Sequence, residues 1–421
     1  MRDDRWKQSR KSGKQMSRGL SKHGAGICFT DDMRREQRDS IMAYQSVDQL
    51  QKVLADRVFH YTKDSKKAAG RALGTVVEII TFYLLKSWGL EHSVAIETAL
   101  PEYGNPEITH NVEYSLHPIL RKHQLLLDSP KLPITASRIL SELQEQLSLE
   151  GFRKSGTTLL TTDRILRNSC TIASGNELRL SANLTTKRAG GLQVAVTEQY
   201  TKPYAMFECK RVGVEEGTRK GPQTIEKAKQ GAYVARTVSS LHKIRMASGE
   251  LRGLIYKSDQ TVHSKPYAEL IAEVVASNDP ELLRDFVLTV GVVSNHGNWF
   301  TSDDHNKELK VMAQSYDWLI FLTDEGLSEF ITELLLRPMP LLKPARAAFL
   351  ASYTAEKKRN RFTKVQMDYK ADQVLQTYFE NNLSRIEKWF SVIAPGNGSM
   401  HKLRTQVVQL HDKDWKAIHS L

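Results

Sequence analysis

The change of hydrophobic period along the chain constrains its fold more than any other feature of the sequence. From Ser40 onward, and most strongly in the run AAGRALGTVVEIITFYLLKSWGL at 68–90, apolar residues recur with the 3.6-residue spacing of a helix. Later, the segments 177–184, 192–201 and 204–211 alternate with the period of two that is typical of strands. The sequence therefore predicts a long buried helix and a meander of three short strands in an α/β or α+β core.

The positions of proline and glycine, together with the hydrophobic period, predict the loops, helices and strands in the rest of the chain. Residues 101–135 contain several prolines, so we expect loops there with one short helix near 116–127, followed by a helix at 136–149. After the third strand we expect helices at 224–244 and 267–275, strands at 286–294 and 317–323, and a mostly helical remainder. The predicted divisions are a flexible basic arm (1–38), a core with helical insertions (39–325) and a mainly helical C-terminal region (326–421).

Composition narrows the class of protein. The 421 residues include 60 Lys and Arg against 48 Asp and Glu, a net charge of +12, which favours a polyanionic partner such as nucleic acid or an anionic membrane surface. No apolar run reaches the roughly eighteen residues of a membrane-spanning helix, so we expect a soluble protein with no membrane partner. Three cysteines without a CxxC pair support neither a disulfide framework nor a zinc site, and we expect a cytoplasmic location.

One triplet in the third predicted strand carries candidate chemistry. Glu208, Cys209 and Lys210 follow one another in YAMFECKR, and the period of a strand places Glu208 and Lys210 side by side on one face. A divalent metal needs oxygen ligands, and a nearby lysine can orient or deprotonate an attacking water. The other acid-x-lysine triplets of the chain lie outside alternating apolar strands. This pair therefore suits hydrolysis of a phosphodiester.

The predicted meander also indicates which residue lies opposite Lys210 on the neighbouring strand. If Lys202 and Pro203 form a two-residue hairpin turn, Ala195 faces Lys210 and shares a face with Glu208. A metal-dependent nuclease would need a second carboxylate at that place. The sequence instead offers an alanine.

The helix after this strand has a polar stripe. Glu226, Lys229, Gln230 and Tyr233 fall on one side of the predicted helix, opposite an alanine-rich apolar side. Such a stripe is commonly a solvated surface. Because it directly follows the strand with the acid and the lysine, we interpret it as lining the same cleft.

Together these residues resemble the PD-(D/E)XK nuclease superfamily, which includes type II restriction endonucleases and RecB-like nucleases. The resemblance spans about residues 70–235. Glu208-Cys209-Lys210 matches the (D/E)XK half of the motif, and Gln230 with Tyr233 is similar to the Q-x-x-Y helix motif of the RecB-like branch. Glu78 matches a glutamate often found on the helix before the meander.

The resemblance implies a fold, a reaction and a set of roles. It implies a mixed sheet flanked by helices, with helical N- and C-terminal additions, in a Mg²⁺-dependent endonuclease that cuts double-stranded DNA at a specific sequence as a homodimer. Glu208 and the carbonyl of Cys209 would bind Mg²⁺ together with an acid whose place Ala195 holds. Lys210 would activate or orient the attacking water, and Gln230 with Glu226 would position that water or Lys210.

Ala195 is where the sequence departs from the family pattern. Either an aspartate was replaced there by engineering, or the site is incomplete and the chain is a catalytically inactive DNA-binding protein. Other acids that could complete the site are Glu198, which has the wrong parity, and Glu177 and Asp163, which need an unusual route to it. A repair or recombination nuclease that acts without a recognition sequence is a further alternative.

Two other segments have the composition of nucleic-acid contacts. The stretch SNHGNWFTSDDHN at 294–306 is either a base-contacting loop or an ordinary polar loop, and no ββα-metal pattern around it supports an HNH nuclease. EKKRNRFTK at 356–364 gathers five cations around Phe362 and is either a phosphate-binding patch or a solvated face.

Overall fold

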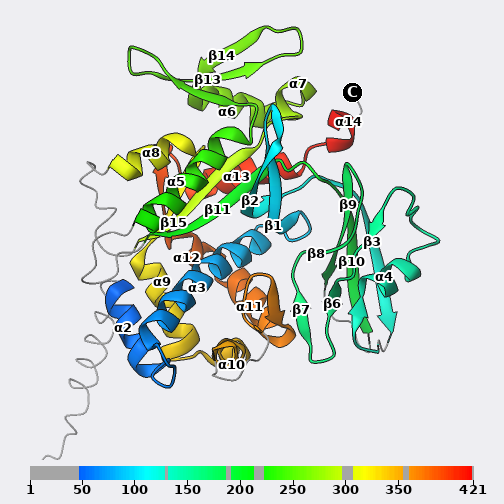
Figure 1. The fold of residues 1–421 in the computed structure, drawn as a ribbon, viewed down its shortest axis with the longest axis vertical. Helices are drawn as coiled ribbons and strands as arrows, with labels where there is room; N and C mark the ends of the chain where they lie inside the picture. The colour runs from blue at the N-terminus through cyan, green and yellow to red at the C-terminus, as the bar shows by residue number, and fades with distance from the viewer. Residues whose placement is uncertain are drawn as a thin grey trace, which may run out of the picture. The chain divides into compact units, whose positions relative to one another are not determined.

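The structure is a computed structural model, and the residues that it describes all lie within Tyr44–Leu421 (Figure 1). The described ranges are 47–128, 131–185, 191–212, 222–295, 307–353 and 360–419. The predicted basic arm, most of the polar stretch at 294–306, the cations at 357–359 and the side chain of Glu226 lie outside the described residues.

A mixed six-stranded sheet forms the centre of the fold, in the order β1-β2-β11-β15-β16-β18. The three central strands β11, β15 and β16 run parallel to one another. The pairs β1–β2, β2–β11 and β16–β18 are antiparallel. The strands are β1 (Val94–Glu102), β2 (Asn105–Leu116), β11 (Ala205–Val212), β15 (Leu288–Asn295), β16 (Trp318–Leu322) and β18 (Phe390–Ala394). The mixed α/β class predicted from the sequence is confirmed.

Helices cover both faces of this sheet because β11 alternates apolar side chains to each side. Phe207 packs in the main core with α3 (Ser65–Ser87), which begins at the N-cap Asp64. Met206 packs on the other face with α5 (Pro222–Thr237) and α8 (Lys307–Ser315). By length and composition α3 would be able to cross a membrane, but most of it is buried inside the protein, as is typical of a core helix in a soluble protein.

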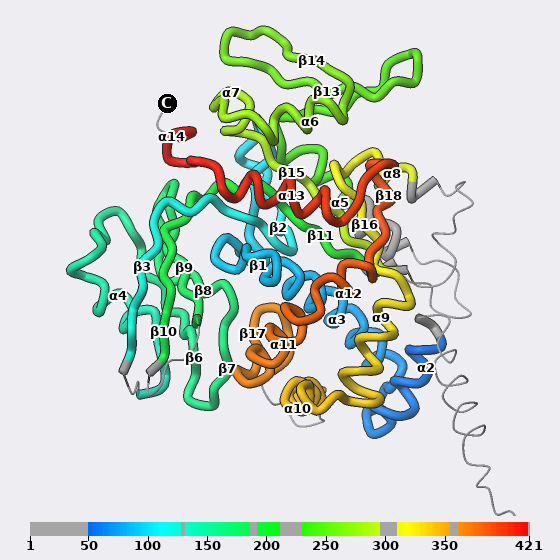
Figure 2. The backbone as a smooth tube through the Cα atoms, turned by 180° about the vertical axis from the view of Figure 1, so that it is seen from behind, coloured from blue at the N-terminus to red at the C-terminus, as the bar shows by residue number. Residues whose placement is uncertain are grey.

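A β-rich region is inserted between β2 and β11 and lies to one side of the central sheet (Figures 1 and 2). It contains a five-stranded antiparallel sheet, one helix and three strands of a small four-stranded sheet around a separate core, and a strand from later in the chain, β17, completes the small sheet. These elements are β3 (Ile119–Asp128), β10 (Gly191–Tyr200), β9 (Leu178–Leu184), β8 (Cys170–Ser174), β5 (Arg153–Lys154), β17 (Gln366–Asp368), β7 (Ile165–Arg167), β6 (Thr158–Leu160), β4 (Ile134–Thr135) and α4 (Ala136–Glu142).

The remaining elements complete the central unit. A three-stranded sheet of β12 (His242–Arg245), β13 (Leu251–Tyr256) and β14 (Val262–Pro266) packs on α6 (Tyr267–Ala276), which precedes α7 (Pro280–Leu283). The other elements, most of which share the core of α3, are α2 (Val47–Arg57), α9 (Asp324–Ile331), the π-helical turn η1 (Thr332–Leu336), the 3₁₀ turn η2 (Pro340–Leu342), α10 (Lys343–Ser352), α11 (Tyr369–Asn381), α12 (Leu383–Glu387), α13 (Met400–His411) and α14 (Trp415–His419).

The prediction of loops at 101–135 was wrong. That range holds the end of β1, all of β2 and β3, and a β-strand replaces the short helix expected at 116–127. Pro101 pairs with Thr109 in the part of the β1–β2 hairpin that extends beyond the pairing with β11. Because β1 is an edge strand, proline does not break a ladder there. The helices predicted at 68–90 and 267–275 and the strands at 286–294 and 317–323 are confirmed, within a few residues at their ends.

The predicted pairing of β10 with β11 was also wrong. Ala195 pairs with Gln124 and Asn183 in the β-rich region and is completely buried. Lys202 and Pro203 do not close a hairpin, because the backbone N–H of Tyr204 donates to the carbonyl of Leu116 in the central sheet. The insertion thus returns the chain to where β2 left the central sheet, and β11 pairs with β2. Only the first two strands of the predicted meander are neighbours.

Candidate functional site

Glu208 and Lys210 lie together on β11, as the strand period predicts. Their side chains form an ion pair, with 8% of the glutamate side chain and 25% of the lysine side chain exposed. Burial raises the pKa of Glu208, and the neighbouring Lys210 acts in the opposite direction. The intervening Cys209 packs its thiol in the core on the side of α3, where burial raises its pKa.

The residue across from Glu208 on the neighbouring strand is Glu113. The ladder between β2 and β11 ends at the pair of Tyr114 and Phe207, so the next position across from Glu208 is Glu113. Instead of a ladder bond, the backbone N–H of Glu113 donates to Oε2 of Glu208 at 3.0 Å. The sequence interpretation missed this residue because it treated 101–135 as loops. Alternation in the segment 112–116 was the available signal.

Two more glutamates join Glu113 around a single lysine. The buried ammonium of Lys364 contacts Glu113 and lies 3.0 Å from Glu97 and 3.5 Å from Glu78. Glu78 comes from α3, and burial raises its pKa while Lys364 opposes the shift. The sequence motifs did not predict Lys364 as the partner of Glu78. We call Glu78, Glu97, Glu113, Glu208, Lys210 and Lys364 the glutamate cluster.

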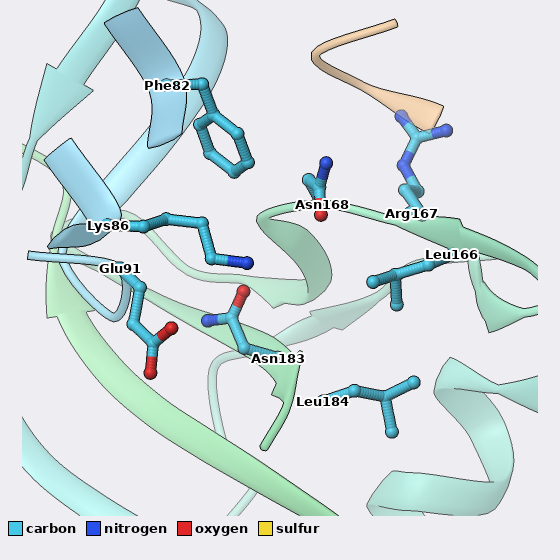
Figure 3. Close-up of a pocket in the computed structure, with 8 residues that line it drawn as sticks. All are labelled: Phe82, Lys86, Glu91, Leu166, Arg167, Asn168, Asn183 and Leu184. Carbon is cyan, nitrogen blue, oxygen red and sulfur yellow. The ribbon is translucent and has the colours of Figure 1, made fainter. Parts of the chain in front are cut away.

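Lys364 reaches this cluster because the β-rich region holds its backbone. The side-chain amide of Asn168 donates to the carbonyl of Lys364, and the backbone N–H of Asn168 donates to that of Val365, both at 2.9 Å. Asn168 also lines a narrow pocket, into which Lys86 of α3 and Asn183 of β9 reach (Figure 3). Lys86 is already paired with Asp372 at 3.1 Å, so we interpret this pocket as structural.

The helix α5 approaches the glutamate cluster at Gly231. A Cβ atom at this position would lie 2.6 Å from Oη of Tyr316, 3.2 Å from Cγ of Glu208 and 3.5 Å from Cε of Lys210. The Tyr316 hydroxyl is buried without a hydrogen-bond partner among the described residues, and burial raises its pKa. A glycine is therefore required for α5 to pack this closely on the pair in β11.

The described side chains of the predicted polar stripe of α5, Gln230 and Tyr233, form no hydrogen bond with Glu208 or Lys210. Gln230 is exposed and forms no hydrogen bond with the other described residues. Tyr233 is 51% exposed, and its ring packs edge-on against His110 of β2, with ring centroids 5.6 Å apart. Of this stretch, Gly231 makes the close approach to Glu208 and Lys210, so no observed contact supports the predicted role of Gln230.

The other acids that the sequence offered lie elsewhere. Glu198 on β10 accepts a hydrogen bond from His123 at 2.9 Å, and Asp163 pairs with Arg361 at 3.3 Å. Glu177 directly precedes β9 in the β-rich region. Their positions give them structural rather than catalytic surroundings.

The glutamate cluster has the donor chemistry of a magnesium site. Carboxylate oxygens are the ligands that Mg²⁺ prefers, and the ammonium of Lys364 shows that a cation is accommodated among three of them. In the described part of the chain, no three His, Cys, Asp or Glu groups already converge as a metal-binding set. The residues therefore fit the ion in kind, and binding would require the carboxylates near Lys364 to rearrange.

No protein-family model, curated protein or solved structure matches the chain. The functional interpretation therefore depends on the geometry of the cluster and on the sequence motifs around it.

Proposed function

We propose that this chain is a Mg²⁺-dependent endonuclease with a PD-(D/E)XK-type core that hydrolyses phosphodiester bonds of double-stranded DNA. The observation that carries the proposal is that Glu113 on β2 lies across from Glu208 on β11, to which its backbone N–H donates, while Glu208 pairs with Lys210. Two carboxylates and a lysine at adjacent positions of neighbouring strands are the groups that such hydrolysis needs.

The cluster suggests a role for each group. Glu113 and Glu208 would hold the metal ion, with the carbonyl of Cys209 as a further oxygen donor. When bound, the ion supplies Lewis-acid stabilisation of the charge that develops on the phosphate. Lys210 would orient the attacking water and hold a proton-donating ammonium beside the reacting phosphate. Glu78, held near the cluster by α3, would orient solvent at its edge.

In the proposed site, Glu113 has the role that the predicted hairpin would give to an acid at position 195. The resemblance requires an acid about one strand before the (D/E)XK strand, and Glu113 occupies that place across from Glu208. The order α3, β1, β2, β11, α5 also places Glu78 on the helix before the strands and Gly231 on the helix after them. Neither an engineered Ala195 nor an inactive protein is then needed to account for the sequence, since both depended on the wrong hairpin.

The substrate class and assembly follow from charge and from the reaction. A net charge of +12 favours a polyanion, and two strands of a duplex are commonly cut by two active sites. We therefore propose sequence-specific cleavage by a homodimer, as in a type II restriction enzyme acting in the cytoplasm.

Digestion of a long duplex of known sequence tests the proposal. With Mg²⁺ we expect discrete bands, and with EDTA we expect intact DNA. A smear would instead indicate a repair or recombination nuclease. Intact DNA with both Mg²⁺ and Mn²⁺, under conditions in which the protein is folded and bound to DNA, would identify a DNA-binding protein.

A further inference from the structure

A groove of about 480 Å³ runs along the N-terminal half of α3. Phe362, at 1% exposure, and the half-buried Tyr353 give it an aromatic floor, whereas its rim is polar. We call it the α3 groove, and the rim residues that matter below are Lys67, Arg71, Thr75, Asn360 and Thr363.

The α3 groove leads to the glutamate cluster along both of its walls. Lys67, Arg71 and Thr75 are spaced one helical turn apart, and Glu78 follows on the same face of α3. On the opposite wall, Thr363 immediately precedes Lys364, which contacts Glu78. Tyr353 lies between the two walls. Burial raises the pKa of its hydroxyl most, and the nearby Glu78 raises it further.

The rim of the α3 groove carries positive charge that no described residue neutralises. Lys67 and Arg71 are exposed, and neither forms an ion pair with another described residue. The acid in the lining, Asp64, accepts a hydrogen bond from the backbone N–H of Lys67 at 2.9 Å as the N-cap of α3. The two cations are therefore available to an anionic ligand.

We propose that the α3 groove binds the sugar-phosphate backbone of the strand that is cut, with Lys67 and Arg71 contacting its phosphates. This inference rests on the proposed nuclease function and names the surface that guides substrate to the cluster. Arg71 precedes Glu78 by two helical turns, which is about 10 Å along the axis. At a rise of about 3.4 Å per nucleotide of one strand, the contacted phosphate lies about three nucleotides from the reacting one. The aromatic floor suits the sugars between them.

A salt series tests this assignment. Binding of a fluorescently labelled duplex is measured by anisotropy in EDTA, so that no cleavage occurs, between about 50 and 200 mM salt. For the double variant Lys67→Gln/Arg71→Gln we expect binding about tenfold weaker and a salt slope reduced in magnitude by about 2, because each lost phosphate contact contributes about 0.9. Lys388→Gln/Lys402→Gln, which removes two exposed cations outside the groove, is the matched control and should leave the slope unchanged.

The outcomes separate this inference from the nuclease proposal. If the double variant is folded by circular dichroism and its slope equals that of the wild type, the α3 groove does not bind the backbone, even if the wild type cleaves DNA. If the slope falls as expected but the wild type never cleaves with Mg²⁺, the groove assignment stands and the nuclease proposal fails. A wild type without salt-dependent DNA binding, or one that prefers an acidic peptide to DNA, overturns the assignment.

Discussion

The central sheet and the β-rich region are built from similar alternating strands, but their buried charged side chains are arranged differently. In the β-rich region, buried charged groups stand apart from one another and each contacts one neighbouring polar side chain. Glu198 meets His123 at 2.9 Å, and the side chain of Arg179 donates to that of Gln199 at 2.8 Å. In the central sheet, four glutamates gather around Lys210 and Lys364.

This difference is why we propose the glutamate cluster, and not the β-rich region, as the site of chemistry. Like charges held close together in a partly buried place are costly, and they persist in proteins mainly where function requires them. The excess negative charge of the glutamate cluster attracts a cation, whereas the paired groups around β10 do not. Ala195 and Glu113 represent the two situations, since the first is buried between the uncharged Gln124 and Asn183 and the second lies across from Glu208.

The largest expected effect comes from removing the lysine of the central sheet. Lys210→Met should lower cleavage by about a thousandfold or more, because a positioned acid–base group contributes about 10² to 10⁴ to a rate. DNA affinity and the circular dichroism spectrum should change little. The rate is measured under single-turnover conditions with Mg²⁺. A variant that cuts at the wild-type rate would show that Lys210 is only a structural partner of Glu208.

Introducing an acid into the β-rich region should damage stability without creating activity. Ala195 has no exposed surface and its cross-strand neighbours Gln124 and Asn183 are uncharged, so Ala195→Asp buries a carboxylate without an opposite charge and should cost about 3–5 kcal/mol in the free energy of unfolding. Ala99→Asp, at an exposed position of strand β1, is the matched control and should be nearly neutral. Urea unfolding measures both. A stable Ala195→Asp protein with increased cleavage would restore the hairpin interpretation and remove Glu113 from the site.

A smaller effect on stability should distinguish alanine substitutions at two helical glycines, Gly231 and Gly74. Gly231→Ala places a Cβ atom 2.6 Å from the hydroxyl oxygen of Tyr316 and should cost about 1–3 kcal/mol by overpacking. Gly74→Ala on α3 meets no atom within 4 Å and should instead stabilise by about 0.5–1 kcal/mol through helix propensity. Equal shifts of the two unfolding midpoints in urea would indicate that α5 does not pack closely on β11.

The smallest effect is a change in how stability depends on pH. Burial raises the pKa of Glu208 above the ordinary 4.5, so the native protein binds this proton more tightly than the unfolded chain does. The contribution of this group to stability is thus complete below about pH 4.5 and is lost as pH rises through the raised pKa. Relative to the wild type, Glu208→Gln should gain stability between about pH 4.5 and pH 7. The exposed Glu145→Gln is the control, and parallel profiles for Glu208→Gln and the wild type would contradict the raised pKa.

Hydrophobic periodicity predicted the parts of the site that lie within a single strand or helix. The strand period placed Glu208 beside Lys210, and the apolar helix around Glu78 was predicted within a few residues. Strand pairing is not encoded locally, however, because the partner of β11 lies before an insertion of more than a whole sheet. Lys364 was unpredictable for the same reason, since it reaches the cluster only through its hydrogen bonds to Asn168.

The central claim is that Glu113 completes the site, and cleavage by Glu113→Gln tests it most directly. The wild type, Glu113→Gln and the exposed Glu107→Gln from the same strand are compared on one long duplex with Mg²⁺, after circular dichroism and DNA binding show that all three are folded and bind alike. We expect the wild type and Glu107→Gln to give the same bands, and Glu113→Gln to be slower by at least about a hundredfold, as expected when a metal-binding carboxylate is lost. Cleavage by Glu113→Gln at the wild-type rate would contradict the claim.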